Sequence, residues 1–246
     1  MAVQIQKSLR VPAWRFFCAL GFLIAMQPRL AEAEEDHGCR VAKDVPVHIT
    51  EVFEEPKIDR TADISAIQKI LSDSRHSIRE NISLGVTHYH PMLELRLPVE
   101  AISFQDGTHC AHILHAEVSI GYQEVVIYIA KEIPEGSCGF NEIMEHERKH
   151  IAVNKQILKD FVPVIEERLN EYLKLNNTFR QEKLGEAVGV VRQKTQAILD
   201  DVGEDMIREN QRRQGAVDSP SEYRRITASC DGQLLEVAER AEKKAH

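Results

Sequence analysis

The chain has 246 residues, and 39 acidic against 31 basic side chains give it a formal net charge of -8. Both signs are mixed along the sequence, so no basic stripe is available to neutralise phosphates, and we expect no nucleic-acid partner. A hydrophobic content of 43% is enough for one sizeable core. After the N-terminal segment no apolar run approaches the length that crosses a bilayer, so we expect no stable membrane span.

The start of the chain has the pattern of a secretory signal peptide. Three basic residues precede an apolar run over residues 16–26, and the small residues Ala31 and Ala33 are suited to cleavage. We therefore predict a signal peptide over residues 1–33 and a mature chain that is secreted or periplasmic. An uncleaved N-terminal anchor helix is the alternative, although the apolar run is short for a membrane span.

Four cysteines follow the predicted signal peptide. In an exported chain we expect them to form two disulfides, because such bonds form and persist in oxidising compartments. Cys110 and Cys138 flank a predicted hairpin, whereas Cys39 and Cys230 lie near the two ends of the mature chain. Three pairings are possible, and we favour Cys110 with Cys138 and Cys39 with Cys230. No spacing typical of a zinc knuckle occurs, which makes metal binding by these thiols the weaker interpretation.

Hydrophobic periodicity predicts an α+β fold with a small antiparallel sheet. A strand is expected over residues 45–53 and a short helix over residues 63–74. Three β-favouring runs should then form the sheet: residues 93–99, 110–120 and 124–130. Turns are expected at Asp106-Gly107, at Gly121 and at Pro134-Glu135-Gly136.

The second half of the chain is predicted to be helical. An amphipathic helix begins near Phe140 and should be kinked or interrupted at Pro163, where the ring removes a backbone donor. We predict a zincin-like catalytic domain over residues 34–175, in which the sheet packs on this helix, followed by a helical C-terminal extension over residues 176–246. The extension should contain a long polar helix, a short helix after a capping loop and a last charged helix.

The motif that indicates chemistry is HExxH, at residues 146–150. Residues four apart on a helix share one face, so His146 and His150 can present their imidazoles to one zinc ion. Glu147 lies one step around the helix, where it can act as a general base on a water molecule without being a ligand. The alternative is that two histidines and their charged neighbours occupy a solvated helix face.

A longer pattern around this motif resembles a known family. Tyr128-Ile129-Ala130, Gly136-Ser137-Cys138, Ile143 and the HExxH segment are together similar to secreted bacterial proteins regarded as zinc-dependent proteases of the HExxH class. The likeness covers about residues 110–154. It implies that His146 and His150 are metal ligands, that Glu147 is the base, and that extended substrate lies along the strand before the helix.

A catalytic zinc needs a third protein ligand and an open position. The HExxHxxGxxH pattern of metzincins is absent, because Val153 and Gln156 stand where its glycine and third histidine would be. In thermolysin-like enzymes the third ligand is a glutamate from the following helix. Glu166, Glu167 and Glu171 lie in that range, and we choose Glu171 as the third ligand.

Other side chains remain candidates for the site. A third nitrogen is also offered by histidines in or near the predicted strands: His88, His90, His109, His112 and His115. Asn154 lies one helical turn beyond His150 and is a candidate to support the ligands. Tyr122 and Tyr128 are candidates to orient an oxyanion, although aromatic residues in a sheet usually serve packing.

The sequence thus predicts a secreted zinc-dependent hydrolase, a metallopeptidase that acts on a polypeptide or a cell-wall peptide. Zinc would activate a water molecule, and Glu147 would take its proton and return it to the leaving amine. Substrate would pair with the edge of the strand over residues 124–130. Two alternatives are a metal-binding envelope protein with a closed four-residue shell and a helical interaction protein without metal.

Overall fold

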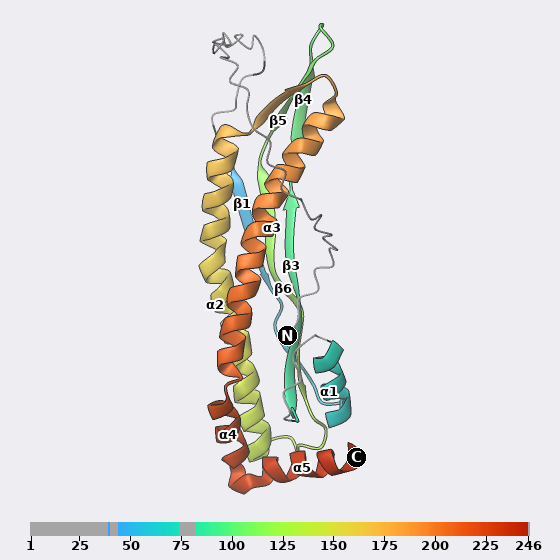
Figure 1. Ribbon diagram of the computed structural model, residues 1–246, viewed down its shortest axis with the longest axis vertical. Coiled ribbons are helices and arrows are strands. Elements are labelled where there is room, and N and C mark those ends of the chain that lie inside the picture. The colour runs from blue at the N-terminus through green and yellow to red at the C-terminus, as the bar shows by residue number, and fades with distance from the viewer. Residues whose placement is uncertain (1–38, 40–43, 74–81, 246) are drawn as a thin grey trace, which may run out of the picture.

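The structure is a computed structural model that describes residues 39, 44–73 and 82–245. The structure contains helices together with strands that form small sheets, which agrees with the predicted α+β class (Figure 1). The predicted signal peptide over residues 1–33 lies outside the described residues. Within the described part of the chain, no helix combines the length and the apolar character that crossing a bilayer requires.

A four-stranded sheet is built around the long strand β6 (Ala116–Ile129). β3 (Gly85–Arg96) pairs with it antiparallel, while β1 (Val47–Phe53) and β2 (Lys57–Asp59) pair with it in parallel on the other side, one after the other. The sheet is therefore mixed, whereas the sequence predicted an antiparallel one. β6 is its centre, so the predicted pairing of substrate with residues 124–130 is wrong: both edges of that strand are occupied, and β3 is an edge strand.

β6 continues through Gly121, where the sequence predicted a turn. The β1 backbone comes so close that a Cβ atom on residue 121 would lie 1.7 Å from the carbonyl oxygen of Val52. Glycine is needed here for the close approach of two strands, which is a recurrent reason for glycine inside a strand. A register shift between His88 and His90 of β3 then marks a bulge, next to Glu124 with its positive φ of 49°.

A second, three-stranded antiparallel sheet lies at one end of the molecule. It has the order β4 (Val99–Ser103), β5 (His109–Ile113) and β7 (Thr178–Gln181). The predicted turn at Asp106-Gly107 connects β4 and β5, with Gly107 at a φ of 83°. The predicted strand over residues 110–120 is thus two strands, β5 and the start of β6, which belong to different sheets.

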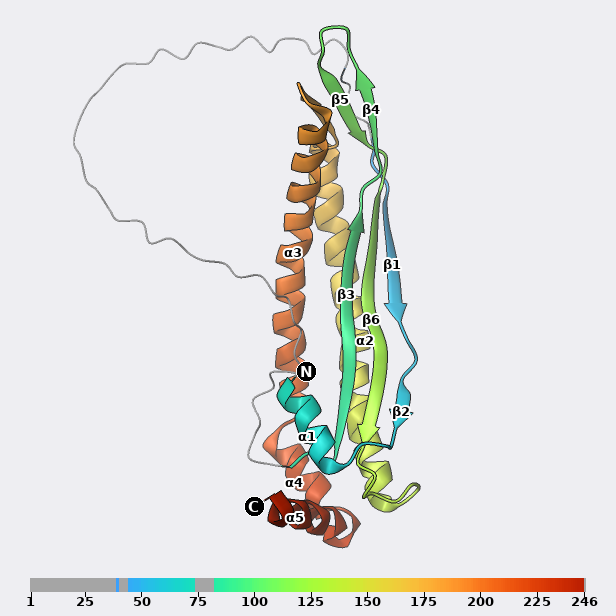
Figure 2. The same cartoon turned by 90° about the vertical axis from the view of Figure 1, so that its right-hand side faces the viewer.

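α2 (Cys138–Leu175) is one continuous helix of 38 residues, about 57 Å long at 1.5 Å per residue. It packs on one face of the four-stranded sheet (Figure 2). Pro163 lies inside it without ending it. The buried stripe of the helix continues on both sides of this proline, from Leu158 to Ile165, and we infer that packing outweighs the missing hydrogen bond.

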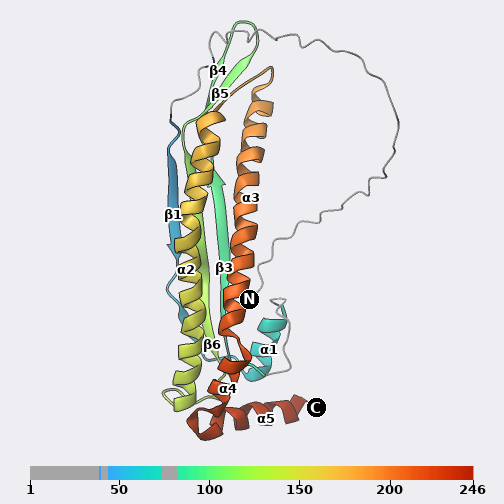
Figure 3. The same ribbon diagram turned by 60° about the vertical axis from the view of Figure 1, so that its left-hand side comes forward.

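α3 (Leu184–Val217) runs back beside α2 after the short link that contains β7 (Figure 3). α4 (Pro220–Ala228), a 3-10 turn (Cys230–Gly232) and α5 (Gln233–Ala245) follow at the end of the molecule where α2 begins, with α1 (Ile64–Asp73) nearby (Figure 1). Buried residues of these C-terminal helices belong to the same hydrophobic core as the sheet: Val191, Leu199, Val202, Met206, Ile226 and Leu234. The predicted C-terminal extension therefore shares the core of the preceding residues.

The two disulfides connect the cysteines differently from the prediction. Cys39 bonds to Cys110 and Cys138 bonds to Cys230, with Cα atoms 5.6 Å and 5.7 Å apart. Cys110 lies in β5, at the far end of β6 from Cys138, and the 14 residues of β6 span about 46 Å. A disulfide needs Cα atoms within about 7 Å, so the predicted bond between Cys110 and Cys138 is impossible in this fold.

The contact at Gly121 leads to a stability prediction. Gly121→Ala should lower the free energy of unfolding by about 3 kcal/mol or more, because a backbone atom of β1 would have to move. Gly189→Ala is the matched control, since Gly189 lies in α3 with open space around a Cβ atom, and it should be neutral or slightly stabilising. Urea denaturation of both variants measures the difference, and equal stability would contradict the close packing of β1 on β6.

Candidate metal centre

The HExxH residues lie on the first turns of α2, on the side of the helix that faces the protein. His146 and Glu147 are buried, with 7% and 3% of their surface exposed, and His150 is partly buried. Glu147 points toward β3, where its Oε2 accepts a hydrogen bond of 2.8 Å from Thr87 Oγ1. These burials argue against the alternative of a solvated helix face.

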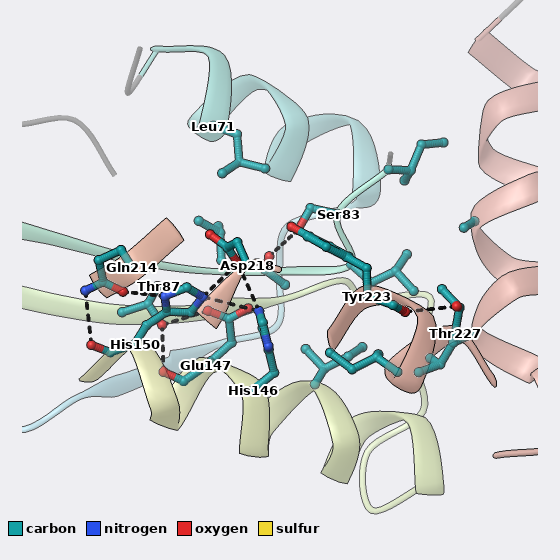
Figure 4. Close-up of a pocket in the computed structure, with 18 of the residues that line it drawn as sticks. Leu71, Ser83, Thr87, His146, Glu147, His150, Gln214, Asp218, Tyr223 and Thr227 are labelled. Atoms are coloured by element: carbon teal, nitrogen blue, oxygen red, sulfur yellow. Dashed lines mark hydrogen bonds and ion pairs between the residues drawn. The ribbon is translucent and has the colours of Figure 1, made fainter. Parts of the chain in front are cut away.

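The third residue of the cluster is Asp218, in the link between α3 and α4. Its Oδ1 lies 3.3 Å from His146 Nε2 and 3.2 Å from His150 Nε2, and the two histidine nitrogens are 3.2 Å apart (Figure 4). Among the described residues, these three side chains form a group with metal-ligand geometry. The second such group contains Cys39 and Cys110, whose thiols are joined in a disulfide.

The predicted third ligand, Glu171, is wrong. It lies on α2, the same straight helix as the histidines, about 30 Å beyond His150 at 1.5 Å per residue, and its side chain is exposed. The prediction assumed that Pro163 ends the first helix and lets a second one fold back. Because α2 continues through Pro163, Glu166 and Glu167 are carried away from the histidines in the same way.

Asp218 is held in place by the joint between α3 and α4. Its backbone N–H closes α3 by donating to Gln214 O at 3.0 Å, and the next residue, Ser219, caps α4 through its side chain. The disulfide between Cys138 and Cys230 then joins the first residue of α2 to the 3-10 turn that follows α4. Ion pairs at this contact join Lys149 to Glu222 at 2.7 Å and Arg225 to Glu142 at 2.7 Å.

Gln214 orients His150 from the last turn of α3. His150 Nδ1 donates to Gln214 Oε1 at 2.5 Å, and Gln214 Nε2 in turn donates to Asn154 Oδ1 at 2.7 Å. A proton on Nδ1 leaves the lone pair of Nε2 for the cluster, which is the tautomer that a metal ligand needs. Asn154, predicted as a supporting residue, is fully buried and acts on the ligand through Gln214.

A further buried polar group lies beside this network. Asn210 Nδ2 donates to Tyr89 Oη at 3.0 Å and to Tyr122 Oη at 3.4 Å. Burial raises the pKa of both phenols, which keeps them neutral. Tyr122 thus has a structural role in the sheet, and Tyr128 lies partly exposed on β6.

The other histidine candidates do not reach the cluster. Thr87 and Tyr89 of β3 face α2 and α3, so the intervening His88 faces the opposite side of the sheet, and His90 is exposed. The remaining three bond elsewhere: His109 to Ser103, His112 to Thr178 and His115 to Glu117. They lie in β5 or just after it, toward the far end of the molecule (Figure 1).

The electrostatics of the cluster favour a cation. Burial lowers the affinity of His150 for a proton, but its hydrogen bond to Asp218 and the charges of Glu147 and Asp218 outweigh burial and raise its pKa to about 9. Burial also opposes the charged form of Asp218, yet its bonds to His146 and His150 hold the pKa of that carboxyl well below the usual range. The two imidazoles thus lie beside two acids.

The spacing of the three donor atoms fits zinc. Donors at 2.0–2.1 Å from a tetrahedral zinc ion lie about 3.3 Å from one another, and the observed separations are 3.2, 3.2 and 3.3 Å. Two imidazoles and one carboxylate are also a donor set that zinc accepts. The residues present therefore fit a zinc ion with three protein ligands.

One side of the cluster borders a cavity of about 120 Å³, lined by His146, Glu147, His150 and Asp218 together with apolar residues. The start of β3 forms one wall, and Gly85 gives it room: a Cβ atom there would lie 2.5 Å from Ile143 Cγ2 and 3.0 Å from Glu147 Oε1. Chemically, the arrangement offers three converging ligands, an adjacent buried carboxylate and space for a reacting group.

One signal in the sequence could have suggested Asp218. Two long helices joined by a short link pack antiparallel, and helices of 38 and 34 residues bring the end of the second back to the beginning of the first. That signal locates a region and does not identify the residue.

The comparisons with known proteins found no relative with which this site could be compared. The chain matched no protein-family model, no curated protein and no solved structure.

Proposed function

We propose that this protein is a zinc-dependent peptidase in which His146, His150 and Asp218 hold the metal and Glu147 is the general base. The observation that carries the proposal is the triangle of donor atoms, whose sides match a tetrahedral zinc site, with Glu147 buried beside it. The resemblance to secreted HExxH proteases supports the same assignment. The two disulfides support an exported protein, since such bonds persist in oxidising compartments.

The chemistry expected of the metal is to acidify a water molecule and to polarise the substrate carbonyl. Glu147 then accepts a proton from the attacking water. The new C–O bond forms, the C–N bond breaks, and Glu147 passes the proton to the leaving amine. Thr87 contributes by fixing one oxygen of the Glu147 carboxylate, which keeps the base in a single orientation.

An extended substrate would lie along β3, which is an edge strand and lines the cavity with residues 85–87. Main-chain hydrogen bonds to an edge strand are a common way to bind a peptide. This placement replaces the one that the sequence suggested on the neighbouring strand. It puts the scissile bond between β3 and the start of α2.

The cavity favours catalysis over a closed metal site. A closed structural zinc site has four protein ligands, whereas the group in the described part of the chain has three, and the cavity borders them. The second candidate function, metal binding without turnover, would need a fourth donor at this position.

Removing the third ligand tests the metal site. The wild type should bind about one zinc ion per chain, and Asp218→Ala should weaken zinc affinity by more than about 100-fold, because even supporting residues of metal sites contribute 10- to 100-fold. Glu171→Ala is the matched control and should bind as the wild type does. Zinc titration against a chelator of known affinity measures both, and an unchanged affinity of Asp218→Ala would refute the ligand assignment.

Replacing the base tests catalysis. Glu147→Gln should keep zinc and the fold, while hydrolysis falls at least 10²- to 10⁴-fold because the group that accepts and returns the proton is lost. Glu145→Gln, an exposed neighbour on the same helix, should remain active. A peptide-library digest by the wild type first supplies a substrate. Equal rates for Glu147→Gln and wild type would exclude the base, and zinc binding without any cleavage would favour the non-catalytic alternative.

Gln214 provides a test of how the ligands are held. Gln214→Leu should weaken zinc binding about 10- to 100-fold, because His150 loses the acceptor that fixes its ring. Gln214→Glu keeps an oxygen acceptor at this position and should restore most of the affinity, which a purely structural role would not explain. Gln211→Leu, exposed on the same helix, is the control. If Gln214→Leu binds zinc as tightly as Gln211→Leu, the supporting role is wrong.

A further inference from the structure

The cavity beside the donor triangle has a strongly apolar wall. Its side chains come from five parts of the fold: Leu71 of α1, Ile82, Leu84 and Val86 just before and at the start of β3, Ile143 of α2, Ile226 of α4, and Leu234 and Ala238 of α5. Leu71 points from α1 toward the side of the cavity that carries His146 (Figure 4). The cavity therefore joins reactive groups on one side to hydrocarbon on the other.

The size of the cavity limits what it can hold. Its volume is about 120 Å³, and an aliphatic cavity of about 150 Å³ holds one benzene molecule. A side chain the size of leucine or methionine matches this space, whereas the ring of phenylalanine needs a larger cavity.

The charges around the cavity further limit the class of substrate that it can bind. Among the described residues that line it, none is a lysine or an arginine, and the acids Glu147 and Asp218 border it. A terminal carboxylate or a phosphate on the substrate would have no cationic partner there other than the metal itself. This favours peptide bonds inside a chain over bonds next to a free C-terminus.

We propose that this cavity is the specificity pocket of the peptidase, which receives an uncharged, bulky apolar side chain next to the scissile bond of an internal peptide segment. The inference rests on the proposed function, because the pocket acts on substrates only if the donor triangle holds zinc. It adds the substrate class: peptide bonds beside leucine or methionine, away from a free C-terminus.

The probes for the test are three small hydroxamates, which share one metal-binding head group. They carry a methyl, a 3-methylbutyl or a carboxyethyl tail, and isothermal titration measures their binding to the zinc-loaded full chain. The 3-methylbutyl tail should bind at least tenfold more tightly than methyl, since each buried methylene contributes about fourfold. The carboxyethyl tail should give no such gain.

Two variants and a control test whether the gain in hydroxamate affinity arises in this cavity. Ala238→Phe should fill the cavity and remove the gain from the 3-methylbutyl tail, whereas Leu71→Ala should enlarge it and improve a phenylethyl hydroxamate relative to the 3-methylbutyl one. Ala228→Phe places the same ring at an exposed position of α4 and should leave the series unchanged. In a peptide-library digest, the wild type should cut beside large apolar residues, and Ala238→Phe should shift the cuts toward small ones.

Each outcome bears on a separate claim. If the methyl probe binds but the apolar tail adds nothing, or if Ala238→Phe keeps the gain of the wild type, the pocket is refuted while the metal site stands. A gain from the carboxyethyl tail refutes the exclusion of charged substrates. If the wild type holds no zinc, the proposed function fails, and the specificity pocket fails with it.

Discussion

The antiparallel contact between α2 and α3 is the constraint on which the rest of the candidate site depends. A single straight helix can offer two ligands one turn apart, but every later residue on the same face lies further along the axis. The third ligand must then come from another element that returns to the same level. α3 does this, and its last turn together with the following joint supplies Gln214 and Asp218.

The contact between the two helices also explains the polar residues in the core. Asn154, Asn210 and Gln214 are buried at the helix and sheet contacts, where an unpaired amide would cost free energy. They bond to one another, to His150 and to the phenols of β3 and β6. Such a network fixes the rotation of each helix about its axis more narrowly than apolar packing does, and rotation decides whether the two imidazoles and the carboxylate converge.

Much of the local structure could be predicted from the sequence, because local patterns carry it. The strand over residues 45–53, the short helix after Asp63 and the helices of the second half follow from periodicity and capping. The pair His146 and His150 with Glu147 between them follows from helical geometry alone. The wrong predictions concern contacts between segments that are far apart in the sequence. The cysteine pairing, the identity of the edge strand and the third ligand each depend on which of these segments meet.

Two misinterpreted residues account for most of these errors. Pro163 predicts a break, but a buried stripe on both sides holds α2 together through the proline. Gly121 predicts a turn, but it serves a close contact between β6 and β1. In both cases a local preference is overridden by packing, which is visible only when the partner segment is known.

The disulfide between Cys138 and Cys230 encloses the whole segment that carries the candidate ligands. It joins residues 92 positions apart, and the contact of His146 and His150 with Asp218 is nested inside that loop. Closing the outer loop shortens the chain that must be ordered to close the inner one, and the reverse also holds. If the donor triangle holds zinc as proposed, oxidation and metal capture are linked reactions, each of which makes the other more favourable. A reduced chain would then hold the metal more weakly than the oxidised chain, so the redox state of the compartment would set how much of the protein is loaded.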